Sequence, residues 1–280
     1  MSSSRWPSAR CFCCNNDAAP TDAITRETFG NSYTEESISK FDSFPEVEVE
    51  GGAKYRGQWK SKKMHGYGRL VGPNGECYEG HFCEGSPHGQ GTFTAANGNR
   101  YEGQWCMDRA HGRGKYSHVD GIVYVGEWVQ DMKSGKGIET WPDGSRYDGD
   151  FANGAKHGHG AYISSSGAIY EGQFKADVMD GKGTYKFNDG RVYAGQWHVG
   201  KMNGKGKMDW PNGSKYEGSY EGDQKHGDGT FTWPDGRHYK GQWRNGKQHG
   251  KATMTLPDGT TSAGEWRDGE PVSAEPVKKT

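Results

Sequence analysis

A period of 23 residues, kept without insertion, is the sequence feature that most constrains the fold. The pattern Tyr-x-Gly-x-aromatic recurs at this interval nine times, and a tenth copy has Ser262 in the tyrosine position. Such a short unit cannot bury an apolar face alone, so the copies must stack on one another. The sequence therefore predicts a repeat array. Its tyrosines are Tyr55, Tyr78, Tyr101, Tyr124, Tyr147, Tyr170, Tyr193, Tyr216 and Tyr239.

Within one repeat, large and small residues alternate in the way that a strand requires. Tyr55, Gly57 and Trp59 are spaced by two, so they share one face of a strand, and the residues between them are polar. Gly68 and Leu70 share a face of the next strand in the same way. Large rings need small residues opposite them, so we expect a core of aromatic rings laid over glycines.

The position of Leu70 is apolar in eight of nine copies, and Glu139 is the exception. Ile138 and Trp141 flank it and suggest a local slip of the strand register there.

Each repeat ends in a turn signal, usually Asn-Gly or Asp-Gly and often preceded by proline, as in Trp141-Pro142-Asp143-Gly144. These pairs suit tight turns with positive φ. One repeat is therefore strand, loop, strand and turn. We predict an all-β fold, an elongated single-layer antiparallel β-hairpin solenoid of ten repeats over residues 51–270, the last one partial. Residues 1–50 are expected to be mostly disordered, with a short element around 41–49, and residues 271–280 to form a flexible tail.

The combination Tyr-Glu-Gly-x-Trp, x-Gly-x-x-x-Gly-x-Gly and Asp-Gly resembles the MORN repeat (membrane occupation and recognition nexus). The resemblance covers about residues 52–270 and implies the hairpin array. Proteins with similar arrays include cytoskeletal and axonemal scaffolds, junctophilins and myosin-binding adaptors. The resemblance thus implies a scaffold that binds protein partners. It also implies homodimerisation through terminal repeats, to which an exposed edge strand is suited.

Composition excludes several other classes. The net charge is −1 and the pI about 6.8, which gives no drive toward nucleic acid. The sequence has no long apolar run and no signal peptide, so we expect a cytoplasmic protein. No phosphate-binding loop occurs, since Gly135-Lys136-Gly137 and similar strings are repeat glycines. We therefore predict no enzymatic activity and no cofactor.

Six histidines share one repeat position, which Ser134, Asp180 and Asn203 fill in other copies. Adjacent copies would lie roughly 10 Å apart, too far to share one metal ion, so we predict a structural role and no metal site. The six are His65, His88, His111, His157, His226 and His249.

The aromatic face is the predicted partner-binding groove, because a single-layer sheet leaves ring edges open to a peptide or helix. The residues assigned to it are Tyr124, Trp128, Tyr147, Phe151, Tyr170, Phe174, Tyr193 and Trp197. The competing interpretation is that these rings form core only.

Basic residues near the first loop of each repeat are predicted to line one edge. This edge either contacts anionic phospholipid headgroups or is a solvated edge that discourages aggregation; interspersed acidic residues favour the second reading. The residues are Lys62, Lys63, Arg109, Lys133, Lys156, Lys201, Lys225 and Lys247.

Cys11, Cys13 and Cys14 cluster near the N-terminus and are either acceptors of S-palmitoylation or free thiols. The first hypothesis of function is accordingly a non-catalytic scaffold in a cytoskeletal, axonemal or membrane-associated assembly. A membrane-tethering adaptor and a regulatory subunit of a separate enzyme are the alternatives.

Overall fold

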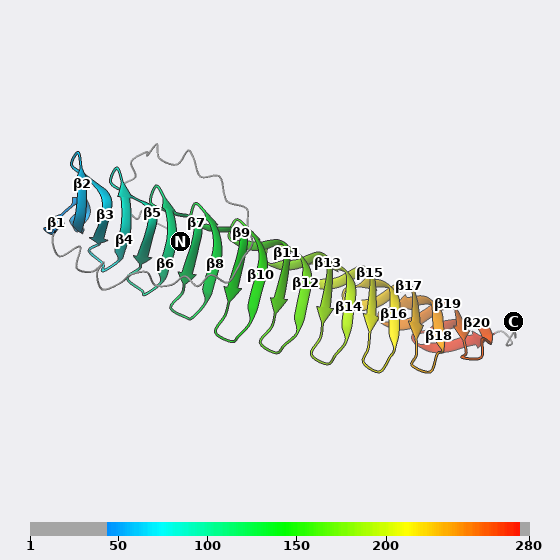
Figure 1. Ribbon diagram of the computed structural model, residues 1–280. Coiled ribbons are helices and arrows are strands. Elements are labelled where there is room, and N and C mark those ends of the chain that lie inside the picture. Colours follow the sequence, from blue (N-terminus) through cyan, green and yellow to red (C-terminus); the bar gives the residue numbers. More distant parts are fainter. Residues whose placement is uncertain (1–43, 275–280) are drawn as a thin grey trace. The chain divides into compact units, whose positions relative to one another are not determined.

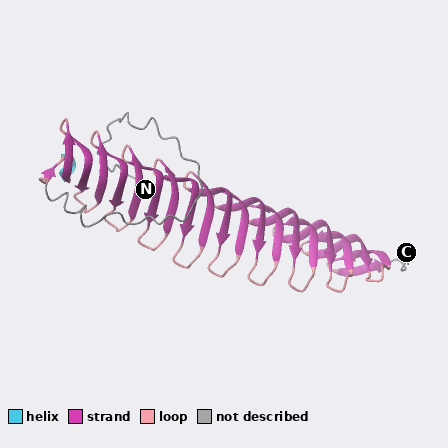
Figure 2. Cartoon of the chain, viewed as in Figure 1, coloured by secondary structure: helices cyan, strands magenta, loops and turns pink. Residues whose placement is uncertain are grey.

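The computed structural model describes residues 44–274, which divide into two compact units. Unit 1 extends to Pro142 and unit 2 begins at Asp143. Within each unit, successive strands pair antiparallel with their neighbours in chain order, as Figures 1 and 2 show. Among the described residues the one helical element is the 3₁₀ turn η1 (Glu50–Gly52). The predicted all-β, single-layer hairpin fold is confirmed.

Unit 1 contains nine strands, and β1 pairs with β2 through Val47 and Tyr55. The strands are β1 (Val47–Glu48), β2 (Lys54–Lys60), β3 (Lys63–Val71), β4 (Cys77–Cys83), β5 (Ser86–Thr94), β6 (Arg100–Cys106), β7 (Arg109–Ser117), β8 (Val123–Val129) and β9 (Met132–Thr140).

Unit 2 contains twelve strands, and its last strand pairs with β20 and runs to Ala274, beyond the expected end of the array at residue 270. The strands are β10 (Arg146–Ala152), β11 (Ala155–Ile163), β12 (Ile169–Lys175), β13 (Val178–Lys186), β14 (Val192–His198), β15 (Lys201–Asp209), β16 (Lys215–Glu221), β17 (Gln224–Thr232), β18 (His238–Arg244), β19 (Lys247–Thr255), β20 (Thr261–Arg267) and β21 (Glu270–Ala274).

Each repeat has two connections, one within its hairpin and one, the Asn-Gly or Asp-Gly turn, that leads to the next repeat. The sequence predicted the second to be the tight turn, but the first is shorter. The predicted first loop is a two-residue turn with both φ values positive, as at Ala176 (48°) and Asp177 (69°). Positive φ at both residues is the type I′ geometry, which matches the twist of a hairpin. The Asp-Gly connection is wider. Its glycine alone has positive φ, as at Gly190 (86°), whose N–H donates to the carbonyl of Phe187 at 3.0 Å.

A β-bulge interrupts the pairing inside each of the ten described hairpins, and in seven of them a side chain of the bulge bonds the opposite strand. In the sixth repeat the register shifts between Gly172 and Phe174, and Gln173 lies between them. Its Oε1 accepts the N–H of Lys182 at 2.7 Å, which satisfies a donor that the bulge removes from the ladder. The same bond links Gln58 to Tyr67 and Gln196 to Lys205. The sequence pattern indicated only that this glutamine position is polar.

The tyrosine of each repeat lies over a pair of glycines, as predicted. Gly149 and Gly160 are opposite one another on β10 and β11, and a Cβ placed on Gly160 would lie 2.5 Å from Cε2 of Tyr147. The Tyr147 hydroxyl donates to the carbonyl of Asp150 at 2.9 Å. All nine tyrosines make the equivalent bond to the residue three positions later, at 2.8–3.0 Å. We call these residues the stack tyrosines.

Within each unit, the stack tyrosines alternate with the second aromatic of the motif to form one continuous column. Tyr170 meets Phe174 of its own repeat at a centroid distance of 5.1 Å and Trp197 of the next repeat at 5.4 Å, with interplanar angles of 89° and 85°. Edge-to-face contacts of this kind stabilise by about 0.5–1.5 kcal/mol beyond area burial. Four of the tryptophans also donate Nε1–H to a glycine carbonyl of the preceding repeat at 3.0–3.2 Å. The column therefore links neighbouring repeats as well as filling each one.

We predict that Gly160→Ala lowers the free energy of unfolding by about 1–3 kcal/mol, because the added methyl group overpacks the ring of Tyr147. The midpoint of urea unfolding measures the loss. The matched control is Ala161→Ser, one residue along the same strand and on its opposite face. An unchanged midpoint for Gly160→Ala would show that the ring does not rest on the glycine.

Burial raises the pKa of Tyr170 and Tyr193 to about 12, above the ordinary value of 10.0. The unfolded chain then loses these protons at lower pH than the folded chain does. Their contribution to stability is complete below pH 10 and is lost as the pH rises toward 12, by about 1.4 kcal/mol per pH unit for each tyrosine. Urea midpoints between pH 8 and pH 11 should therefore fall steeply only above pH 10. A midpoint that stays level to pH 11 contradicts the assignment.

Candidate interaction surfaces

The eight rings assigned to the partner-binding groove are buried in the structure. Tyr124, Tyr147, Tyr170 and Tyr193 have 0% exposure, and Trp128, Phe151, Phe174 and Trp197 have 4–6%. The expectation of open ring edges was wrong because the tyrosines have glycines beneath them, and each tyrosine packs edge to face against the second aromatic of its own repeat. The remaining side is covered by two further residues of each repeat, described next. A partner would meet those covering residues instead of the column itself.

The first covering position, the cover position, is that of Leu70, opposite the stack tyrosine. Its described members are Leu70, Phe93, Tyr116, Glu139, Tyr162, Tyr185, Met208, Phe231 and Met254.

The second, the slot position, lies opposite the second aromatic of the motif. Its described members are Met64, Pro87, Ala110, Lys133, Lys156, Met179, Met202, Lys225 and Gln248.

In unit 2, large rings at the cover position and in the wider turns are only half-buried. Tyr185 contacts Phe187 at a centroid distance of 4.5 Å, and Phe231 contacts Trp233 at 4.7 Å and Trp210 at 5.6 Å. We call these five residues the aromatic ridge. The sequence held a signal for it, since Trp210 and Trp233 stand before the Pro-Asn-Gly and Pro-Asp-Gly turns.

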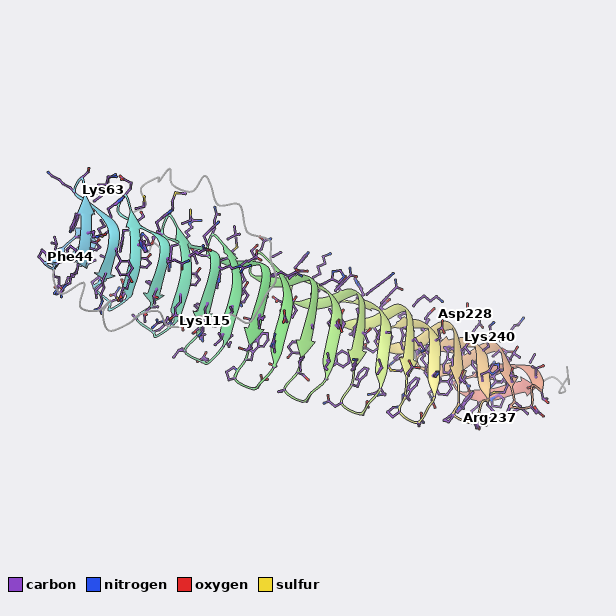
Figure 3. The ribbon with its side chains drawn as sticks, viewed as in Figure 1. Phe44, Lys63, Lys115, Asp228, Arg237 and Lys240 are labelled. Atoms are coloured by element: carbon purple, nitrogen blue, oxygen red, sulfur yellow. The ribbon has the colours of Figure 1, made fainter. Side chains whose placement is uncertain are left out.

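Arginines of the wider turns accompany the ridge. The guanidinium carbon of Arg191 lies 4.5 Å from the ring centroid of Phe187, and that of Arg237, labelled in Figure 3, lies 5.5 Å from Trp233. Each arginine is held by the aspartate two residues earlier, at 2.7 Å. Half-buried rings beside ordered cations are typical of protein-binding surfaces.

The eight basic residues predicted to line one edge are divided between two environments. Five of them are exposed: Lys62, Lys63, Arg109, Lys201 and Lys247. Lys133, Lys156 and Lys225 are half-buried slot residues beside the aromatic column. The division arises because successive strand residues point to opposite faces of the sheet. A basic residue one position further along its strand therefore points toward the aromatic column instead of away from it.

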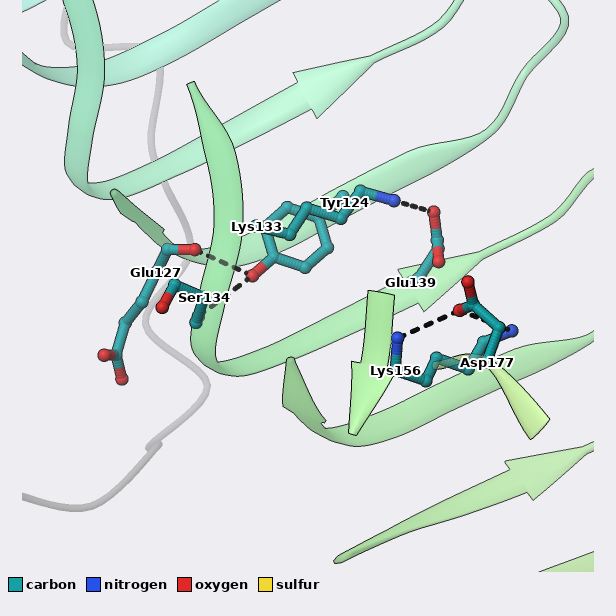
Figure 4. A network of polar contacts seen from close by, with 7 residues as sticks. All are labelled: Tyr124, Glu127, Lys133, Ser134, Glu139, Lys156 and Asp177. Carbon is teal, nitrogen blue, oxygen red and sulfur yellow. Dashed lines mark hydrogen bonds and ion pairs between the residues drawn. The ribbon is translucent and has the colours of Figure 1, made fainter. Parts of the chain in front are cut away.

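Glu139 does not mark a slip, because it pairs with Tyr124 in the usual register. Its carboxylate is almost fully buried and forms an ion pair with the ammonium of Lys133. Figure 4 shows this pair beside Tyr124, whose ring centroid is 5.1 Å from Nζ of Lys133. A lysine in the slot position thus compensates for a carboxylate in the cover position.

Lys156 occupies the slot position of the fifth repeat. Its Nζ lies 5.7 Å from the ring centroid of Tyr147, 5.9 Å from that of Tyr162 and 3.9 Å from Oδ1 of Asp177. Figure 4 shows the contact with Asp177, whose Oδ1 also accepts the backbone N–H of Lys156 at 2.9 Å. The lysine side chain therefore lies between two rings and a carboxylate of the next repeat.

Lys225 has rings around it but, within the described residues, no ion pair. Its Nζ lies 4.3 Å from the centroid of Trp243, 4.7 Å from that of Phe231 and 5.5 Å from that of Tyr216. Burial lowers the pKa of Lys225 to about 8 from the ordinary 10.5, since the rings only partly replace water around the ammonium.

The slot of the third repeat has the smallest side chain of the nine, Ala110, and a cavity of about 250 Å³ lies there. Its walls include Tyr101, Tyr116, Trp128 and Asp131. The sequence carries no signal for this site, because a single alanine at one position of one repeat forms no motif.

The opposite face of unit 2 carries a shallow hollow of about 930 Å³ over the paired glycines. Lys205, Lys207 and Lys240 line it together with Glu217 and Asp228, so its charge is mixed; Lys240 and Asp228 are labelled in Figure 3.

No group of three or more His, Cys, Asp or Glu side chains in residues 44–274 is arranged to hold a metal ion. In the same range no helix is long and apolar enough to cross a membrane. Cys11, Cys13 and Cys14 lie outside the described residues.

Fold and surfaces together define a repeat protein, an array of antiparallel hairpins held by a tyrosine–glycine column. Comparison with protein families shows which family of repeat proteins this is. The MORN repeat model matches nine consecutive segments: residues 55–77, 78–100, 101–123, 124–146, 147–169, 170–190, 193–215, 216–236 and 239–261. These segments make up most of the chain, and the chain belongs to the MORN-repeat family, as the sequence predicted. This is a non-enzymatic repeat family.

Comparison with curated protein sequences finds no match. Among solved structures, the TCP domain of Drosophila melanogaster SAS-4, in complex with a proline-rich motif of Ana2, is 13% identical, with 90% of this chain and 97% of that chain covered and a TM-score of 0.29. The TCP10 domain of Danio rerio CPAP is 9% identical over 82% and 99% of the two chains, with a TM-score of 0.26. A streptogramin B lyase is 10% identical over 80% and 83%, with a TM-score of 0.17.

For the pair Lys133–Glu139 we predict strong non-additivity. Lys133→Met leaves a buried carboxylate without its cation and should cost about 3 kcal/mol. Adding Glu139→Leu restores the usual apolar cover residue and should recover most of that loss. Chemical unfolding of both single variants and the double variant measures the coupling. Additive losses contradict the ion pair.

Proposed function

We propose that this protein is a non-catalytic scaffold that binds a segment of a protein partner along the aromatic ridge of unit 2. The observation that carries the proposal is the ridge itself, a set of half-buried rings at repeat intervals over a column that is already complete without them. Large rings left partly in water at regular spacing suit a peptide or helix with apolar residues, since most of the binding energy of an interface comes from such anchors.

Repetition supports a scaffold in preference to a catalyst. The stack tyrosines keep their hydroxyls bonded to main-chain carbonyls, and burial raises the pKa of Tyr170 and Tyr193 to about 12, so they are poor proton donors and acceptors near neutral pH. MORN membership agrees with a structural role. We place the scaffold in a cytoskeletal, axonemal or membrane-associated assembly on the resemblance stated from the sequence.

The two alternatives remain hypotheses without a specific surface to favour them. Tethering by acylation depends on Cys11, Cys13 and Cys14, outside the described residues. Contact with anionic phospholipid would use the predicted basic edge, of which five residues are exposed and three lie beside the aromatic column. Homodimerisation through terminal repeats and regulation of a separate enzyme likewise stay predictions.

The test is recovery of partners with the tagged, full-length protein from its native cells. We expect Trp210→Ser combined with Trp233→Ser to reduce the recovered partner about ten-fold or more, because both anchors are lost. Val119→Ser combined with Val199→Ser is the matched control, since both valines are exposed apolar residues outside the ridge, at 63% and 64%. Undiminished recovery with a ridge variant whose unfolding midpoint is unchanged would falsify the assignment.

A further inference from the structure

Three wall residues of the cavity at Ala110 in unit 1 correspond to the residues that contact Lys156 in its slot in unit 2. Around Lys156 these are the stack tyrosine Tyr147, the cover residue Tyr162 and the turn residue Asp177 of the next repeat. The corresponding residues around Ala110 are Tyr101, Tyr116 and Asp131, and all three line the cavity.

The match extends to the backbone. Asp131 Oδ1 accepts the N–H of Ala110 at 2.8 Å, just as Asp177 Oδ1 accepts the N–H of Lys156 at 2.9 Å. Trp128, which also lines the cavity, occupies the position of Phe174. The third repeat therefore keeps the walls of a lysine slot and lacks the lysine.

We propose that this cavity, the Ala110 pocket, binds a lysine side chain presented by the protein partner. The inference rests on the proposed scaffold function in one respect, namely that the lysine belongs to a protein partner. The pocket chemistry itself is independent of the aromatic ridge, which lies in unit 2.

The arrangement of Lys156 shows how the lysine is held. Its alkyl chain passes the column while the ammonium lies over two tyrosine rings and near a carboxylate. Cation–π contacts strengthen when water is excluded, and the paired carboxylate offsets the cost of removing the ammonium from water. In the Ala110 pocket the carboxylate is already oriented by the N–H of Ala110, so little ordering is required on binding.

The carboxylate distinguishes this pocket from a merely apolar one. Lys225 has an aromatic surround without an ion pair in the described residues, and there burial lowers the pKa of the amine to about 8. In the Ala110 pocket Asp131 contributes a negative charge. Burial is the main cause that raises the pKa of Tyr101, and the charge of Asp131 raises it further. A cation is therefore favoured over a neutral chain of equal length.

The experiment titrates the full-length protein with Nα-acetyl-lysine amide while the indole N–H signals of Trp105 and Trp128 are followed by NMR. Both indoles line the pocket, and their N–H groups donate to Gly91 and Gly114 carbonyls. We expect saturable shifts with the lysine amide and at least about ten-fold weaker binding of Nα-acetyl-norleucine amide, which has the same four side-chain carbons but no ammonium group. Equal binding of the two amides, or no saturable shift, overturns the proposal.

Two variants make the result specific to the pocket. Ala110→Lys introduces the residue found at this position in the fourth, fifth and eighth repeats and should abolish binding by filling the pocket from within. Asp131→Asn keeps an oxygen for the N–H of Ala110 and removes the charge, so lysine amide should bind about ten-fold more weakly and norleucine amide as before. Lysine amide that still binds either folded variant as tightly as wild type refutes the site.

Failure of this proposal and failure of the proposed function are separable. Loss of partner by the ridge variants with no amide binding refutes the Ala110 pocket alone. Amide binding with undiminished partner recovery by the ridge variants refutes the ridge alone.

Discussion

The contact between a tyrosine ring and two backbone-paired glycines is the interaction on which the rest of the structure depends. At Gly149 and Gly160 the absence of side chains lets the ring of Tyr147 lie directly on the sheet. From there its hydroxyl donates to the carbonyl of Asp150, the residue in the bulge. Its edges receive Phe151 and Phe174, one from its own repeat and one from the next. The same ring thus determines strand packing, bulge position and repeat stacking, so a hairpin that is marginal alone becomes stable in an array.

Because the column is so uniform, the individuality of each repeat lies in the side chains that cover it. The slot position takes methionine, proline, lysine, glutamine or alanine without disturbing the tyrosines. Where a carboxylate enters the cover position, at Glu139, a lysine in the slot balances it. Where the slot holds alanine, at Ala110, a cavity remains. Variation at this one position therefore converts a structural repeat into a series of different local surfaces.

Two features with functional potential follow from this division of labour. In unit 2 the cover position and the wider turns carry rings larger than the column needs, and these form the aromatic ridge. In unit 1 the slot of the third repeat carries a side chain smaller than its walls accommodate. Both the larger side chains of the ridge and the smaller side chain at Ala110 depart from the repeat pattern. Departures of this kind are informative in a repeat protein, because stability alone is satisfied by the consensus.

The sequence by itself determined the hairpin array, its period, the two faces of each strand and the placement of rings over glycines, because these depend on spacing and residue size alone. Tertiary structure decided what that spacing could not. Trp128 is core because the ring of Tyr101, from the preceding repeat, and the ring of Tyr124 both pack against it, and exposure depends on neighbours distant in the chain. The bulge filled by Gln173 shifts the register within the hairpin, so alternation counted along the chain fails across it. Three of the predicted edge lysines lie against the column for a related reason: Lys133, Lys156 and Lys225. The length of the two-residue turn decides which residue of the following strand faces inward, and that length is seen only in the folded structure.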